Sequence, residues 1–237
     1  MDLSVVIPAY NECNTIKDNV LRIKEQLKAM EIRNEIIVVN DGSTDGTFHK
    51  ARKVADMVLT HYPNRGKGSA ILKGIRKTIY EYVAIMDADL QVALHELQVF
   101  LRIMELYNAD GVVGSKRHPY SNLTYPLHRR FISDGYNFMC RKLFGIELRD
   151  TQCGLKLFRK RVLNEVIDCL KIKGFALDLE LIVACKERMF RIADAPVNIY
   201  KQSGPGSVSV KTITQTFIDT LKVWYNKKRG VYGKEEI

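Results

Sequence analysis

Two carboxylates stand two residues apart in Asp87-Ala88-Asp89, directly after the apolar run YVAIM at residues 82–86. Carboxylate oxygens are the ligands that Mg²⁺ and Mn²⁺ prefer, and such ions usually complete their coordination with phosphate oxygens of a ligand. We therefore expect Asp87 and Asp89 to hold a divalent cation that binds phosphates. A solvated aspartate turn is the alternative, because Asp is common in turns.

Two further polar clusters follow apolar runs, Ala9–Glu12 after LSVVI and Asn40–Asp45 after EIIVV. Tyr10 could stack on a base, and Asp41 could hydrogen-bond a base or a ribose, although both clusters could also be helix caps and turns. A third cluster, Asn64–Gly68, precedes a helical pattern, so Lys67 and exposed amide groups could bind an anion there. The chain lacks a glycine-rich phosphate loop of the GxGxxG or GxxxxGK[ST] type, which favours a cation as the partner of the phosphates.

The spacing of apolar residues predicts the elements that position these clusters. Strands are expected at 3–7, 35–39, 57–60, 82–86 and 111–114, and helices at 14–30, from about 45, 67–80 and 94–107. Short apolar strands that alternate with helices predict a mostly parallel α/β sheet covered on both faces, and ligands bind at the carboxyl ends of such strands. After residue 115 we expect helices at 126–144, 160–169, 177–188 and 212–226, and strands at 153–158 and 190–200.

The composition indicates an ordinary globular protein. The 237 residues are 46% hydrophobic, and no apolar run reaches the length of a membrane span. Five scattered cysteines and the absence of a signal peptide predict a reduced, cytoplasmic setting. The net charge of +10 favours anionic partners such as phosphates, nucleic acid or an acidic membrane. Nucleic acid is not expected, because it would leave the polar strand ends without a role.

The last predicted helix has apolar residues at helical spacing, Ile213, Phe217, Leu221 and Trp224, followed by Lys227, Lys228 and Arg229. This pattern suits an amphipathic helix at the surface of an anionic membrane. It equally suits a helix that packs on the core and carries a basic tail.

The motifs VVIPAYNE, VVNDGSTDGT, NRGKG and MDADLQ, in this order, resemble the family 2 glycosyltransferases with the GT-A fold. The later VVGSKR, RDTQCGLKLF and FALDLEL resemble the branch that moves a hexose from a nucleotide diphosphate to a polyprenyl or dolichyl phosphate, and TQCGLKLF is nearest to the dolichyl-phosphate glucosyltransferases. The resemblance implies a transferase domain over 1–210, with a nucleotide-binding half (1–115) and an acceptor half (116–210). Residues 211–237 would then form the C-terminal helix and basic tail.

The resemblance also implies roles by position. Asp89 and Gln91 would ligate Mg²⁺ or Mn²⁺ with Asp87 nearby, Lys67 and Arg117 would contact phosphates, and Arg129 and Ser133 would receive the lipid phosphate. The nucleotide-sugar would contact Pro8, Tyr10, Glu12, Val39, Asp41, Lys67, Asp87 and Ala88. Arg129 could instead belong to a solvated basic helix face. Relatives carry a lysine near the C-terminus where this chain has Val208, so Lys201 or Lys211 would have to replace it.

The implied reaction inverts the configuration at the anomeric carbon. Asp89, Arg117 and Asp178 are the residues expected to act in catalysis. A phosphate acceptor is already ionised, whereas a sugar hydroxyl would need a carboxylate base, for which Asp178, Glu180 and Asp150 are the candidates. A hexosyltransferase acting on a hydroxyl acceptor and a non-catalytic nucleotide-sugar-binding subunit therefore remain alternatives. A lipid acceptor implies peripheral attachment to the cytoplasmic face of a membrane, directly or through a membrane-protein partner, and a homo-oligomer is also possible.

Overall fold

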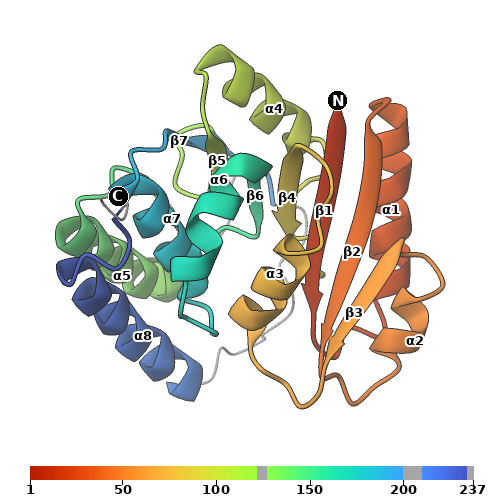
Figure 1. Ribbon diagram of the computed structural model, residues 1–237, viewed down its shortest axis with the longest axis horizontal. Helices are drawn as coiled ribbons and strands as arrows, with labels where there is room; N and C mark the ends of the chain where they lie inside the picture. The colour runs from red at the N-terminus through yellow and green to blue at the C-terminus, as the bar shows by residue number, and fades with distance from the viewer. Residues whose placement is uncertain (122–126, 200–209, 234–237) are drawn as a thin grey trace.

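The computed structural model describes residues 1–121, 127–199 and 210–233, and the side chains of 127–133 and 210 are not described. Seven strands of this part form one sheet in the order β3-β2-β1-β4-β6-β5-β7 (Figure 1). Strand β6 is antiparallel to both of its neighbours, and the other pairs are parallel. The strands are β1 (Asp2–Ala9), β2 (Arg33–Asp41), β3 (Met57–His61), β4 (Tyr82–Met86), β5 (Gly111–Ser115), β6 (Leu155–Arg159) and β7 (Ile192–Pro196).

Helices cover both faces of the sheet. Helices α1 (Ile16–Ala29), α2 (Thr47–Ala51) and α4 (Glu96–Leu106) lie on one face. Helices α3 (Lys67–Ile75), α6 (Lys160–Val166) and α7 (Leu177–Glu187) lie on the other. Helices α5 (Leu127–Phe144) and α8 (Val210–Lys228) pack against each other, and α8 also packs on α7. A 3-10 turn, Ile167–Cys169, follows α6.

The alternation of side chains along the strands builds two cores. In β1, Val5 and Ile7 pack with α1 and α4, whereas Val6 faces α3. Helix α7 is buried along nine consecutive residues, Leu177–Cys185, because β7 and α6 contact one side of it and α8 another. The predicted α/β fold and its mostly parallel sheet are confirmed.

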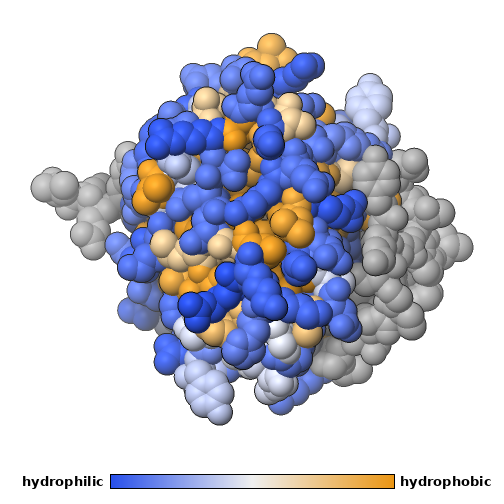
Figure 2. All heavy atoms as spheres, turned by 90° about the vertical axis from the view of Figure 1, so that its right-hand side faces the viewer, coloured by the Kyte–Doolittle hydropathy of each residue, from blue (hydrophilic) through white to orange (hydrophobic). Residues whose placement is uncertain are grey.

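The outer surfaces differ in character. The face that includes α1, α2 and β3 is mainly hydrophilic, with apolar side chains visible only in patches between polar ones (Figure 2). On the side of the molecule where α5 and α8 lie in Figure 1, α8 exposes a group of large apolar side chains, Ile213, Phe217, Ile218, Leu221 and Tyr225. Within the described residues, every helix is too short or too polar to cross a bilayer.

Candidate active site

The end of β4 places Asp87 against the start of β6. The backbone N–H of Asp87 donates to the carbonyl oxygen of Gly154 at 3.0 Å. A Cβ at position 154 would lie 2.6 Å from Oδ2 of Asp87, so any other residue there would require this carboxylate to move. The antiparallel direction of β6 creates this contact, because it brings the residue before β6 to the carboxyl end of β4.

The next residues turn sharply. Leu90 has a φ of 46°, a left-handed conformation that a branched side chain rarely adopts. This turn brings Asp89 and Gln91 to the same place, where Nε2 of Gln91 lies 2.7 Å from Oδ2 of Asp89. Asn19 of α1 also holds the turn in place, since its Nδ2 donates to the carbonyl oxygen of Ala88 at 2.7 Å. The polar triplet is therefore held by backbone geometry and by a neighbouring helix.

A small cavity of about 20 Å³ lies at this turn. Asp87, Asp89 and Gln91 line it together with Lys116 and Gly154. The volume suits one water-sized body, and the lining oxygens are the type that a hard divalent ion prefers. No cluster of three His, Cys, Asp or Glu suited to a metal occurs in the described part of the chain.

Lys67 at the first position of α3 points to the same place. Its Nζ lies 2.6 Å from Oδ1 of Asp87 and 5.8 Å from the centre of the Phe175 ring. Burial favours the uncharged forms of both partners, but their mutual attraction outweighs it: the pKa of Asp87 lies below its usual value and that of Lys67 above. Asp178 and Asp89 add to the attraction that raises the pKa of Lys67. The site therefore holds a charged lysine beside the charged carboxylate of Asp87.

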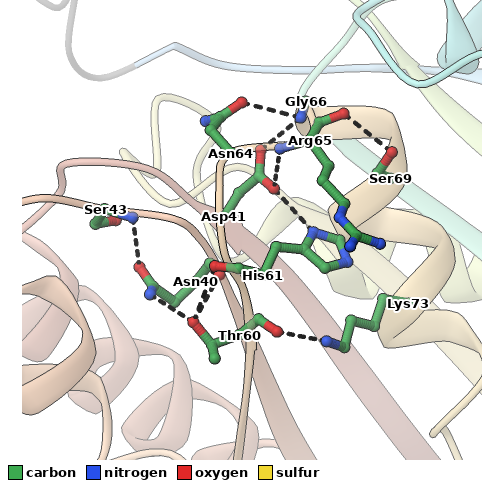
Figure 3. Close-up of polar contacts among 10 residues, drawn as sticks. All are labelled: Asn40, Asp41, Ser43, Thr60, His61, Asn64, Arg65, Gly66, Ser69 and Lys73. Carbon is green, nitrogen blue, oxygen red and sulfur yellow. Dashed lines mark hydrogen bonds and ion pairs between the residues drawn. The ribbon is translucent and has the colours of Figure 1, made fainter.

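Asp41 at the end of β2 is almost fully buried and faces the loop that leads to Lys67 (Figure 3). Its Oδ1 lies 2.9 Å from Nδ1 of His61 and accepts the N–H of Arg65 at 3.0 Å. Its Oδ2 accepts the N–H of Gly66 at 2.8 Å. These partners make Asp41 a clamp on the residues that precede Lys67, and nucleoside binding by Asp41 stays a prediction.

The ends of β1 and β2 are connected by hydrogen bonds. The side chain of Asn11 accepts the N–H of Thr44 at 2.9 Å, and the N–H of Asn11 donates to Oγ of Ser43 at 3.0 Å. Asn11 thus joins two strand ends, whereas the helix cap considered for it would have required α1 to begin earlier than Ile16.

The predicted nucleotide-contacting residues at this edge differ in exposure. Tyr10 is 50% exposed, as a stacking surface requires. Pro8, Val39 and Ala88 are buried, so only their backbones could reach a ligand. Glu12 accepts a hydrogen bond from Thr15 at 2.7 Å. The structure brings the three predicted strand ends to one edge of the sheet.

Asp178 and Lys156 form a buried ion pair beneath the site. Oδ1 of Asp178 lies 2.9 Å from Nζ of Lys156, which also donates to the carbonyl oxygen of Cys153 at 2.7 Å. The side chains are 5% and 1% exposed. Lys156 was missed as a site residue, although a single charge inside the apolar strand LKLF was a usable signal. Lys116, which lines the small cavity, was not predicted as a site residue either.

The other predicted residues lie around this centre. Arg117 follows β5, and its Nε lies 2.9 Å from Oδ1 of Asp134 on α5. Arg129 and Ser133 belong to α5, but their side chains lie outside the described residues. Residues 201 and 205–208 also lie outside the described residues, whereas Lys211 is exposed at the start of α8.

Two of the candidate bases are engaged by the protein itself. Asp150 accepts the N–H groups of Lys116 and Gln152 at 3.2 and 2.9 Å. Glu180 is fully buried and accepts hydrogen bonds from two backbone N–H groups and from the Tyr232 hydroxyl. Burial raises the pKa of Glu180, and these hydrogen bonds oppose the shift. Neither carboxylate faces the cavity at the end of β4.

Known proteins resemble this chain in sequence and in fold. Residues 4–167 match the model of the family described as "Glycosyl transferase family 2". The dolichyl-phosphate beta-glucosyltransferase of Drosophila melanogaster is 29% identical over 98% of this chain and 77% of its own length. The glycosyltransferase AglD of Haloferax volcanii is 28% identical over 95% of this chain, which spans 37% of that relative's length.

Solved structures have the same fold. Glucosyl-3-phosphoglycerate synthase of Mycobacterium tuberculosis, solved with Mn²⁺, UDP and glucosyl-3-phosphoglycerate, superposes with a TM-score of 0.72. That match has 16% identity and covers 99% of this chain and 81% of the other. Mannosyl-3-phosphoglycerate synthase of Rubrobacter xylanophilus gives a TM-score of 0.71 at 16% identity, over all of this chain and 77% of the other. The predicted GT-A architecture is thereby confirmed, and the chain belongs to glycosyl transferase family 2.

Proposed function

We propose that this protein transfers a hexose from a nucleoside diphosphate sugar to a polyprenyl or dolichyl phosphate, with a divalent cation at the end of β4. The observation that carries the proposal is the convergence of Asp87, Asp89 and Gln91 on one small cavity, with Lys67 paired to Asp87 at its edge. Relatives named dolichyl-phosphate beta-glucosyltransferase support the acceptor class, and UDP-glucose is the donor we favour over GDP-mannose.

The residues of the site would act mainly on the leaving diphosphate. Asp89 and Gln91 would hold Mg²⁺ or Mn²⁺, with Asp87 beside them, and the bound ion would neutralise charge that develops on the diphosphate. Lys67 stays protonated and is fixed by Asp87, so it can offer a preorganised positive charge to the same oxygens. Tyr10 would cover the base at the exposed edge of β1.

The state of the candidate bases supports a phosphate acceptor. Asp178 is paired with Lys156, and Asp150 and Glu180 accept hydrogen bonds from the backbone. A phosphate needs no base, only cations that orient it, and Arg117 lies beside α5, which also carries Arg129 and Ser133. Asp178 would then stabilise the site rather than take a proton.

The test is transfer from radiolabelled UDP-glucose or GDP-mannose to dolichyl phosphate, with a hydroxyl-terminated glycoside as the competing acceptor. Label should enter the lipid fraction only when Mg²⁺ or Mn²⁺ is present. Asp89→Ala should lower turnover by at least about 100-fold, since it removes a transition-state electrostatic contact. Label found only in the glycoside would show that the acceptor is a hydroxyl and not a lipid phosphate. If no common donor gave any transfer, the proposal that the protein is this enzyme would be refuted.

We further propose that α8 makes the membrane contact that such an acceptor requires. Phe217, Ile218 and Leu221 are each more than 40% exposed, and Lys222 and Arg229 lie on the same helix or directly after it. Exposed apolar residues beside cations suit an anionic bilayer surface. The double variant Phe217→Ser/Leu221→Ser should lose sedimentation with phosphatidylserine vesicles but keep transfer to a short, water-soluble prenyl phosphate. Unchanged sedimentation would exclude this contact.

A further inference from the structure

Glu180 and Tyr232 are buried polar residues that the proposed chemistry does not use. Oε1 and Oε2 of Glu180 lie 3.1 and 3.0 Å from the backbone nitrogen of Lys171, and Oε2 accepts the N–H of Ile172 at 2.8 Å. The hydroxyl of Tyr232, a fully buried residue after α8, donates to Oε1 at 2.7 Å. These bonds fix the start of a segment, residues 170–175, which we call the backing segment.

The backing segment lies directly behind the loop that presents Lys67. The N–H of Ser69 donates to the carbonyl oxygen of Lys173 at 3.1 Å. A Cβ at Gly66 would lie 2.5 Å from that oxygen, and a Cβ at Gly68 would lie 2.8 Å from it. Both glycines that flank Lys67 are thus required by close approach of the backing segment's main chain.

The same segment also contacts the Lys67 side chain. The centre of the Phe175 ring lies 5.8 Å from Nζ of Lys67. The same Nζ lies 2.6 Å from Oδ1 of Asp87. Any shift of the backing segment would therefore move the backbone of Gly66 and Gly68 and the ring beside the ammonium group. An electrostatic contact of this kind depends on placement within a fraction of an ångström.

We propose that Glu180 and Tyr232 are positioning residues that hold Lys67 at the donor diphosphate by fixing the backing segment. The inference rests on the proposed function, because it assigns the diphosphate as the ligand of Lys67. Tyr232 lies after α8, so the end of the described chain and the first turn of α3 are joined through one carboxylate. Glu180 is accordingly removed from the candidate bases.

The experiment is calorimetric binding of UDP, with GDP in parallel, in the presence of Mn²⁺. Tyr232→Phe removes one hydroxyl and keeps the ring, and we expect about a threefold to tenfold weaker affinity, the effect of one ordinary buried hydrogen bond. Tyr136→Phe is the matched control, because it removes a hydroxyl that bonds Thr220 at 2.8 Å between α5 and α8 and not Glu180. The control should bind as the wild type does.

A double-mutant cycle separates positioning from general loosening of the fold. In a Lys67→Ala background, Tyr232→Phe should have no further effect on affinity, because the group that it positions is gone. An equal loss in both backgrounds, or no loss in the single variant, would overturn the inference.

Hydrogen exchange of the wild type tests the same idea without a variant that has to fold. UDP with Mn²⁺ should protect the amides of residues 170–174 together with those of 66–69, and protection confined to 66–69 would also overturn it. A wild type that binds neither nucleotide would instead refute the proposed donor, and this inference with it.

Discussion

At the scale of single residues, the site depends on charges held in fixed positions. Asp87 is confined between Gly154 and Lys67, and Asp89 and Gln91 meet because Leu90 adopts a left-handed backbone conformation. Such a conformation costs on the order of 1 kcal/mol or more for a residue with a side chain, and strain of this kind is concentrated at functional sites. The geometry of the triplet is therefore maintained against a local preference of the chain.

The Lys67–Asp87 pair should make stability depend on acidic pH. The folded-state pKa of Asp87 is lowered, so its contribution to the free energy of unfolding is fully present above the unfolded value of about 3.8. It is lost as pH falls through the lower, folded-state pKa. Urea unfolding from pH 7 to pH 2.5 should show a constant gap between wild type and Asp87→Asn above about pH 5 and a shrinking gap below pH 4. A gap that does not change with pH would mean that Asp87 is not charge-paired in solution.

The buried pair between Lys156 and Asp178 makes a second prediction. Lys156→Met leaves the Asp178 carboxylate buried without its cation, and we expect a loss of about 3–5 kcal/mol in the free energy of unfolding. The double variant Lys156→Met/Asp178→Leu removes both charges and should recover most of that loss. If the two variants were equally unstable by chemical denaturation, packing rather than charge would explain the requirement for Lys156.

At the scale of elements, the contact between α3 and residues 170–174 requires small side chains. Gly68→Ala would place a Cβ 2.8 Å from the carbonyl oxygens of Lys173 and Gly174, both backbone atoms. We expect a loss of about 1–3 kcal/mol in stability and weaker binding of nucleoside diphosphate. Gly135→Ala is the control, because a Cβ at that helical position meets no atom within 4 Å and alanine favours the helix by about 0.5–1 kcal/mol. Thermal unfolding should therefore move in opposite directions for the two variants.

The sequence allowed most elements to be predicted, because apolar spacing reports burial directly. The direction of β6 could not be predicted, since LKLF has the same pattern in a parallel or an antiparallel strand. Gly154 and Lys156 enter the site through that direction, so their neighbours in the site could not be predicted, although the charge of Lys156 in an apolar strand marked it as unusual. The partners of Asp41 were equally hidden, because they come from His61, Arg65 and Gly66, which a turn sequence does not pair with a distant strand end.

At the scale of the whole molecule, the sheet runs through both of the predicted halves. Strands β5 and β7 are joined to β4 only through β6, which lies between them and belongs to residues after 116. The helices α5 and α8 pack together beside α7, so the proposed acceptor side is built on the same sheet as the proposed donor site. The division into a nucleotide-binding half (1–115) and an acceptor half (116–210) is therefore a proposal about function, and the sheet itself is not divided there.

The small number of oxygen ligands that the protein itself offers leads to a prediction about metal affinity. The cavity offers oxygens of Asp87, Asp89 and Gln91, one side of an ion's coordination sphere. Titration of Mn²⁺ into the protein alone should give millimolar or weaker binding, and addition of UDP should tighten it at least about tenfold, because phosphate oxygens complete the sphere. Equal affinity with and without UDP would show that the protein supplies a complete set of ligands by itself.

The antiparallel strand β6 also has a consequence for how the chain is made. While the protein is being synthesised, β4 keeps one edge without its partner until Leu155–Arg159 have left the ribosome, and β5 waits for the same strand. One edge of β4 and both edges of β5 are thus open together in the nascent chain, and unpaired strand edges can pair wrongly with other chains. The strand that lies beside Asp87 is therefore also the one that covers the open edge of β4 and one edge of β5.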